Sequence, residues 1–171
     1  MKAPRCARSY SRAVSAADST VLSEEIAAFV GSGLAVVVAT RDALLRPEIA
    51  RGWGLEVASD RSAVTLCVSV APGSPTRANL EQNGSVAITC SRPSTYRTVQ
   101  LKGNAIELRE PDEERLVRVR EHLAAFVEEV WRVGVQREGA QSLLERDLVE
   151  ATIALREVFD QTPGANAGAR L

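Results

Sequence analysis

The chain of 171 residues has very little histidine and cysteine, the residues most often used for nucleophilic catalysis and metal binding. A hydrolytic triad needs a histidine, and His122 is the only one. It shares a stripe of the expected helix with Arg115, Arg118 and Glu129, opposite the apolar positions. We therefore expect an exposed surface side chain there rather than a proton shuttle or an axial ligand. No group of residues has metal-ligand spacing, so an enzyme built on this sequence would take its chemistry from a cofactor.

The three cysteines, Cys6, Cys67 and Cys90, are odd in number, far apart and without a CxxC pair. This pattern predicts buried thiols in a reducing cytoplasm rather than a disulfide framework or a zinc site. The longest apolar run, 33–39, is far too short for a membrane span. A net charge of −1 lacks the basic excess of general nucleic-acid and membrane-surface binders. We therefore expect a cytoplasmic protein that binds neither nucleic acid nor membrane.

The first 20 residues differ in composition from the rest of the chain. Four Lys or Arg residues precede the first acid, Asp18, and no apolar stretch of a secretory signal is present. We expect residues 1–20 to form a disordered tail, with an organelle transit peptide as the alternative. The globular domain is expected at 21–162. The small, breaker-rich residues of QTPGANAG predict a flexible or cofactor-proximal tail at 163–171.

Hydrophobic periodicity predicts a mainly β protein with flanking helices. The expected strands are 34–40, 47–57, 63–70, 85–90, 95–108 and 147–160, and the expected helices are 23–30, 75–84, 111–134 and 136–145. Most of these strands are linked as hairpins. Six antiparallel strands of this length tend to close into a barrel, because closure removes exposed edges. The element order and the lack of a GxGxxG turn argue against a dinucleotide-binding fold.

The fifth expected strand has one apolar face and one polar face. The apolar face consists of Val99, Leu101, Gly103 and Ala105, as a packed core requires. The polar face consists of Tyr96, Thr98, Gln100, Lys102 and Asn104. Because this polar face contains no acidic residue, it suits either solvent or a polar anionic ligand.

Two arginines stand where an anion could bind. Arg51 alternates in the second strand with Ile49, Trp53 and Leu55, so it shares a face with apolar side chains. A guanidinium in that setting needs an anionic partner, which is either a carboxylate of the protein or a ligand phosphate. Arg77 begins the short helix, where free N–H groups also attract anions, although an exposed helix arginine would produce the same pattern.

Three stretches of the sequence, together with the order of the expected elements, carry a resemblance to a known protein family. RGWGLEV is a strand that starts with an arginine, and GSPTRANLEQNGSVAITC is a small polar turn followed by a helix and a strand. YRTVQLKGNAIEL is a strand with Arg97 six residues before Gly103. Over residues 22–160 the chain resembles the pyridoxamine 5′-phosphate oxidase-like family of FMN-binding split barrels. The resemblance implies a six-stranded antiparallel split β-barrel.

The resemblance also implies a homodimer with FMN in a cleft at the subunit interface. The FMN phosphate would meet Arg51, Ser74, Thr76 and Arg77, and Thr98 occupies the position of a flavin-contacting glutamine. The full set of implied cofactor-binding residues is Arg51, Gly52, Trp53, Ser69, Ser74, Thr76, Arg77, Arg97, Thr98 and Gln100. The polar face of the fifth strand would then be one wall of the flavin cleft.

Several departures separate the chain from the vitamin B6 oxidase proper. Glu56 stands where that enzyme has a lysine, Thr76 replaces another basic residue, and FDQTPGANAG replaces a C-terminal motif with arginine and histidine. The resemblance therefore implies a flavin-dependent oxidoreductase or flavin reductase that acts on another, unidentified small molecule, with no side chain assigned as catalytic. The broader family also contains binders of haem and of deazaflavin F420. A non-catalytic binder of one of these, or a dimeric interaction module, is the alternative.

Overall fold

The computed structural model describes residues 10–11, 20–70, 73–141, 143 and 147–171. Its elements in chain order are β1 (Tyr10–Ser11), α1 (Glu24–Val30), β2 (Ala35–Arg41), β3 (Pro47–Val57), β4 (Ala63–Ser69), α2 (Thr76–Gln82), β5 (Ser85–Ser91), β6 (Thr98–Arg109), α3 (Glu113–Trp131), α4 (Arg137–Gln141) and β7 (Leu148–Asp160). None of the helices in these described ranges is long and apolar enough to cross a membrane.

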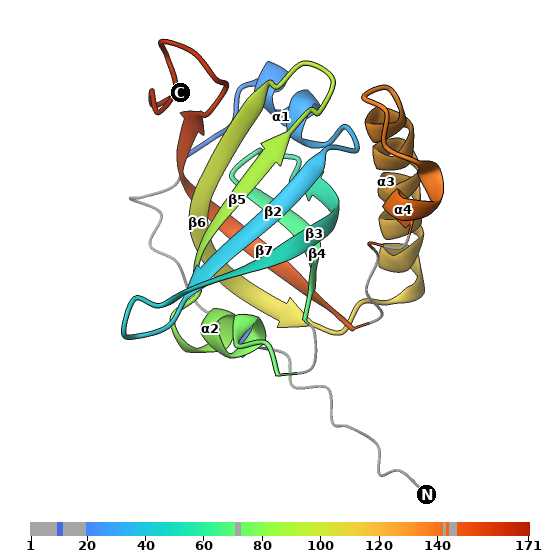
Figure 1. Ribbon diagram of the computed structural model, residues 1–171. Coiled ribbons are helices and arrows are strands. Elements are labelled where there is room, and N and C mark those ends of the chain that lie inside the picture. The colour runs from blue at the N-terminus through green and yellow to red at the C-terminus, as the bar shows by residue number, and fades with distance from the viewer. Residues whose placement is uncertain (1–9, 12–19, 71–72, 142, 144–146) are drawn as a thin grey trace, which may run out of the picture.

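The predicted six-stranded antiparallel barrel is confirmed (Figure 1). The strands follow the order β6-β5-β2-β3-β4-β7, and pairing of β6 with β7 closes the ring. The two-residue strand β1 extends the sheet beyond β6, where Tyr10 pairs with Leu108. It falls in the segment expected as a disordered tail, most of which lies outside the described residues.

The barrel interior is the main hydrophobic core, and alternation along the strands fills it. Val99, Leu101, Val149 and Ile153 are all at most 2% exposed, as the sequence predicted. At Gly103 an added Cβ would lie 2.1 Å from the carbonyl oxygen of Ala154. Only glycine therefore permits the close approach of β6 and β7 at this point.

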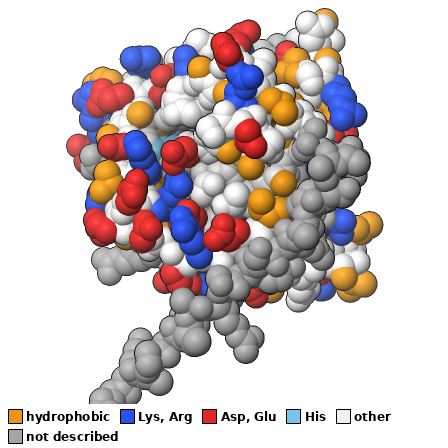
Figure 2. Space-filling view, turned by 180° about the vertical axis from the view of Figure 1, so that it is seen from behind, with side chains coloured by type: hydrophobic (Ala, Val, Ile, Leu, Met, Phe, Trp, Pro, Cys, Tyr) orange, Lys and Arg blue, Asp and Glu red, His pale blue; other side chains and the backbone are white. Residues whose placement is uncertain are grey.

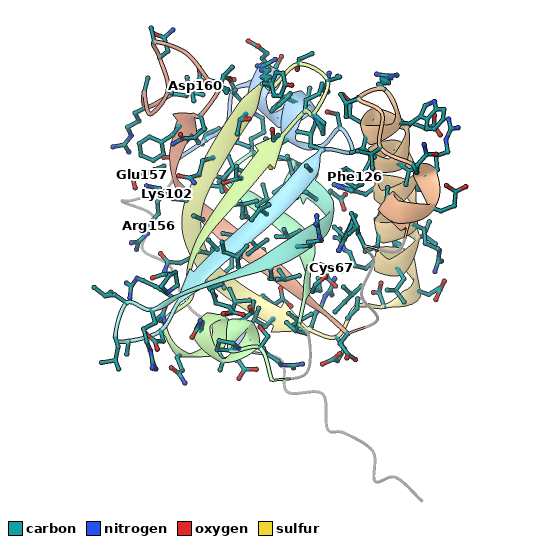
Figure 3. All side chains as sticks on the ribbon, viewed as in Figure 1. Cys67, Lys102, Phe126, Arg156, Glu157 and Asp160 are labelled. Atoms are coloured by element: carbon teal, nitrogen blue, oxygen red, sulfur yellow. The ribbon has the colours of Figure 1, made fainter. Side chains whose placement is uncertain are left out.

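A second core lies between the outer face of β3 and β4 and the helix α3. It contains Trp53, Cys67 and Phe126, the last two labelled in Figure 3. Cys67 and Cys90 are buried free thiols, as predicted, and burial raises the pKa of each to about 12. Cys6 lies outside the described residues. Helix α3 thus covers one part of the outer barrel surface.

The apolar side of α3 packs on the barrel as expected, but the expected exposure of His122 and Glu129 is wrong. His122 and Glu129, expected on the solvated face, are only 7% and 8% exposed, while Val119 and Phe126 lie on the same buried stripe. Each inward polar side chain has a specific partner: His122 Nε2 lies 2.8 Å from the carbonyl oxygen of Leu34, and Glu129 accepts hydrogen bonds from Ser94. Burying a polar side chain costs free energy, which is why the helical pattern placed His122 and Glu129 in solvent. Their tertiary hydrogen bonds offset that cost.

The C-terminal residues fold back along the end of β7. The amide of Gly168 donates to the carbonyl of Asp160 at 2.6 Å, and the amide of Leu171 donates to Val158 at 2.9 Å. Arg170 forms a β-bridge with Phe159. Backbone hydrogen bonds therefore hold the segment expected as a flexible or cofactor-proximal tail against the barrel.

Candidate functional site

The outer face of β2, β5 and β6, together with the first half of β3, is not covered by any of the described helices (Figure 1). Strand register sets one row of side chains across it: Arg51 is opposite Val37, Val37 is opposite Thr89, and Thr89 is opposite Gln100. Side chains of directly opposed residues project from the same side of a sheet. We call this row and its neighbours the open face.

Arg51 lies on the open face and is exposed, not half-buried as its apolar neighbours suggested. Ile49 projects from the same side and is 69% exposed, whereas Trp53 is covered by α3. A bulge between Trp53 and Glu56 shifts the register of β3, and Leu55 packs into the barrel interior instead. Ile49 and Trp53 share a face of β3 with Arg51 as predicted, but Leu55 does not, and the shared face is the outer face of the barrel.

The guanidinium of Arg51 has no hydrogen-bond or ion-pair partner among the described residues. The sequence left two kinds of partner open for Arg51, a carboxylate of the protein and a ligand phosphate. No carboxylate partner is found among the described residues. An exposed, uncommitted guanidinium on a sheet suits a forked contact to phosphate or carboxylate of a bound molecule.

The polar face of β6 lies on the open face as expected, and its side chains bond to β5. Gln100 Nε2 donates to Thr89 Oγ1 at 3.2 Å, and the hydroxyls of Thr98 and Ser91 are 2.8 Å apart. All four side chains are partly buried. Neighbouring hydroxyl and amide groups of this kind could exchange some of these bonds for hydrogen bonds to a polar ring edge.

A groove of about 460 Å³ continues the open face between β2, β5, β6 and β7. It is lined by the cations Arg41, Lys102 and Arg156 and by one acid, Glu157. Figure 3 shows Lys102, Arg156 and Glu157 together at the β6–β7 edge. Lys102 Nζ lies 4.5 Å from the ring centre of Phe159. The excess of positive charge favours an anionic ligand. Arg156 was missed from the sequence, because nothing there indicated that β7 would pair with β6.

The expected phosphate loop at the start of α2 is internally bonded. Ser74 Oγ donates to Glu48 at 3.3 Å, and Thr76 is fully buried. Arg77 forms ion pairs with Glu81 at 3.1 Å and Glu110 at 2.8 Å, and hydrogen bonds to these carboxylates raise its pKa. Arg77 is therefore committed to carboxylates of its own chain.

Arg97 is committed in the same way at the other end of β6. It pairs with Glu25 at 2.6 Å, and its guanidinium carbon lies 4.5 Å from the ring centre of Phe29. Arg97 comes directly before the 12-residue strand β6. Glu110, the partner of Arg77, comes directly after this strand. At about 3.4 Å per residue the two sites are roughly 40 Å apart along the strand. One chain therefore cannot bring Arg77 and Arg97 to the same phosphate.

Gly52, Trp53 and Ser69 are enclosed in the fold. An added Cβ at Gly52 would lie 2.6 Å from Val36 Cγ1, inside the barrel. Trp53 Nε1 donates to Ser69 Oγ at 3.2 Å, and both side chains are at most 3% exposed. Of the ten expected site residues, the open face brings together Arg51, Thr98 and Gln100.

Comparison with known proteins gives matches to solved structures only. No family model matches the chain, and no curated protein does. HupZ of Group A Streptococcus is similar over 86% of this chain and 100% of its own, with 20% identity and a TM-score of 0.52. A Lactobacillus delbrueckii protein, provisionally assigned as a pyridoxamine 5′-phosphate oxidase, is similar over 81% of this chain and 93% of its own, with 18% identity and a TM-score of 0.50. At these identities the likeness concerns the fold. The chain has the pyridoxamine 5′-phosphate oxidase-like split-barrel fold, as its sequence predicted.

Proposed function

We propose that this protein is a homodimer that binds FMN between the open faces of its two subunits and acts as a flavin-dependent oxidoreductase or flavin reductase on a small molecule. The observation that carries the proposal is Arg51. It is exposed, has no partner among the described residues, and stands in register with Val37, Thr89 and Gln100. A polar sheet with one uncommitted guanidinium suits a ligand that is planar at one end and anionic at the other.

Only some of the expected cofactor-binding residues lie on the open face, and we assign contacts with FMN to those residues alone. Arg51 would bind the phosphate through its forked donors. Thr98 and Gln100 would hydrogen-bond the polar edge of the ring. FMN, when bound, supplies hydride transfer, and the protein supplies orientation and exclusion of water. Arg77 and Arg97 are occupied by carboxylates, so we assign them no direct contact with the phosphate in the same chain.

A second subunit is part of the proposal because the open face is incomplete as a ligand cleft. Ile49 is 69% exposed and Val37 36% exposed beside Arg51, so apolar surface adjoins the polar wall in water. Packing a second copy on this face would remove that apolar area from water and enclose the ligand. Cys67 and Cys90 are buried and free of any disulfide, which is consistent with the cytoplasmic location that we include in the proposal.

The absorption spectrum of the purified protein, before and after incubation with FMN and gel filtration, tests the cofactor. We expect the two-band spectrum of an oxidised flavin to remain with the protein. A Soret band would instead indicate haem, and the single long-wavelength band of a deazaflavin would indicate F420. A colourless protein that retains no FMN would contradict the proposal and favour an interaction module.

A further inference from the structure

A cavity of about 550 Å³ lies away from the open face, between the turn after α1, the end of β3 and α3. Its lining includes the methyl groups of Ala27 and Ala125 and the imidazole of His122, and the charged residues Glu56, Arg118 and Glu121 also line it. This volume is in the range of small-molecule pockets, about 300–1,000 Å³. The space therefore suits a small organic molecule with an apolar body.

His122 gives the cavity one defined polar group. Its Nε2 lies 2.8 Å from the carbonyl oxygen of Leu34, and a carbonyl only accepts, so Nε2 carries the proton. The neutral imidazole then has its lone pair on Nδ1. Trp53 contacts the imidazole edge to face, with ring centres 6.0 Å apart, which limits rotation of the ring. His122 is thus held as a fixed hydrogen-bond acceptor.

The acceptor Nδ1 is open to the cavity rather than sealed in the protein. No hydrogen-bond partner for Nδ1 is found among the described residues. In the same part of the chain, no buried side-chain nitrogen or oxygen lacks a partner. Nδ1 must therefore lie at accessible surface, and His122 is 93% buried except where it lines the cavity.

The charges around the cavity are largely paired. Glu56 of β3 forms an ion pair with Arg115 at 3.2 Å, and Glu121 pairs with Arg118 at 3.4 Å. Burial lowers the pKa of His122, so the imidazole carries no charge at neutral pH. An anionic ligand would find no uncommitted cation there, and a neutral ligand loses least on entering.

We propose that this cavity binds a small neutral molecule that has an apolar body and one O–H or N–H group, and that this group donates a hydrogen bond to Nδ1 of His122. The site is independent of the proposed flavin, since it uses a different surface and no residue of the open face. Nothing in it requires a metal ion, and no metal-binding group of acids, cysteines and histidine is found among the described residues.

Phenol is the probe, and anisole, which has the same ring without the donor, is its control. Because His122 is the only histidine, the imidazole ¹⁵N signals of the labelled protein report on this site alone. We expect the free protein to show the Nε2–H tautomer. Phenol should shift the Nδ1 signal saturably at millimolar concentration. Anisole should bind about threefold to tenfold more weakly, as the loss of one hydrogen bond predicts.

Leucine substitutions at two neighbouring alanines test whether phenol binds in this cavity. Ala125 lines the cavity, whereas the neighbouring exposed Ala124 lines a different groove against α4. Ala125→Leu should abolish the phenol shift and Ala124→Leu should leave it unchanged, with thermal melts confirming that both fold. The Nδ1–H tautomer, equal binding of anisole, or phenol binding that survives Ala125→Leu would each overturn the proposal.

Discussion

Three polar side chains of α3 form hydrogen bonds to distant segments of the chain. His122, Glu129 and Arg115 all lie on the inner side of α3, and each has a partner from a distant segment. The helical pattern alone placed them in water, because it contains no information on those partners. Arg51 shows the opposite error: its apolar neighbours suggested burial, yet its face of β3 is the outer one.

Stability should fall with acid because of His122. Burial lowers the pKa of the folded imidazole below its ordinary value of 6.5. Below pH 6.5 the unfolded chain therefore binds the proton more readily, and the free energy of unfolding falls by up to about 1.4 kcal/mol per pH unit until the folded pKa is reached. Urea unfolding across this pH range measures the slope.

His122→Gln is the control for this slope, since its amide nitrogen can still donate to Leu34 while the titrating group is gone. We expect the variant to lose the part of the pH dependence that belongs to the histidine. An unchanged slope would show that another group is responsible.

Arg51→Ala should weaken FMN binding and leave folding intact. The side chain is exposed and makes no contact that stabilises the described fold, so the free energy of unfolding should change by no more than about 0.5 kcal/mol. Loss of a charge-assisted bond to phosphate, about 1.5–3 kcal/mol, corresponds to roughly a tenfold to hundredfold lower affinity. Fluorescence titration with FMN and thermal melts measure both quantities.

Arg77→Ala is the matched comparison, because Arg77 is occupied by Glu81 and Glu110. It should reduce FMN affinity less than Arg51→Ala does. If Arg51→Ala binds FMN like the parent but melts much earlier, Arg51 is a structural residue and its assignment is wrong.

At the scale of elements, the strands were the most predictable part of the fold. β3 and β7 begin and end within one residue of their expected bounds, because period-two alternation between turn residues is a local signal. The buried face of β6, including Gly103, was predicted correctly. Which strands would meet, and so the groove between β6 and β7, depends on closure of the barrel and has no local signal.

Gly103→Ala tests the closeness of β6 and β7. The added methyl would lie 2.1 Å from the backbone oxygen of Ala154, which cannot move away as a side chain could. We expect a loss of about 1–3 kcal/mol in urea unfolding, as for other overpacked cores. At Gly139, where an added Cβ meets none of the described residues within 4 Å, alanine should have little effect. Equal effects of the two changes would contradict the close approach.

At the scale of the whole molecule, the surface on the side of α3 differs in composition from the open face. Figure 2 shows acidic and basic side chains interspersed over the side on which α3 lies, a surface suited to solvent. The open face is different, because it combines the exposed apolar residues Ile49 and Val37 with the exposed cation Arg51. The family resemblance predicted a paired, cofactor-bearing barrel, and our proposal assigns the second copy and the cofactor to the open face.

Sedimentation velocity of the FMN-incubated protein, followed at a visible wavelength absorbed only by the flavin, tests this account most directly. The chain has a mass of 18.4 kDa. We expect the flavin signal to sediment with a particle of twice that mass at micromolar concentration. Flavin that stays unsedimented, or that moves with a single chain, would contradict a cofactor site between two open faces.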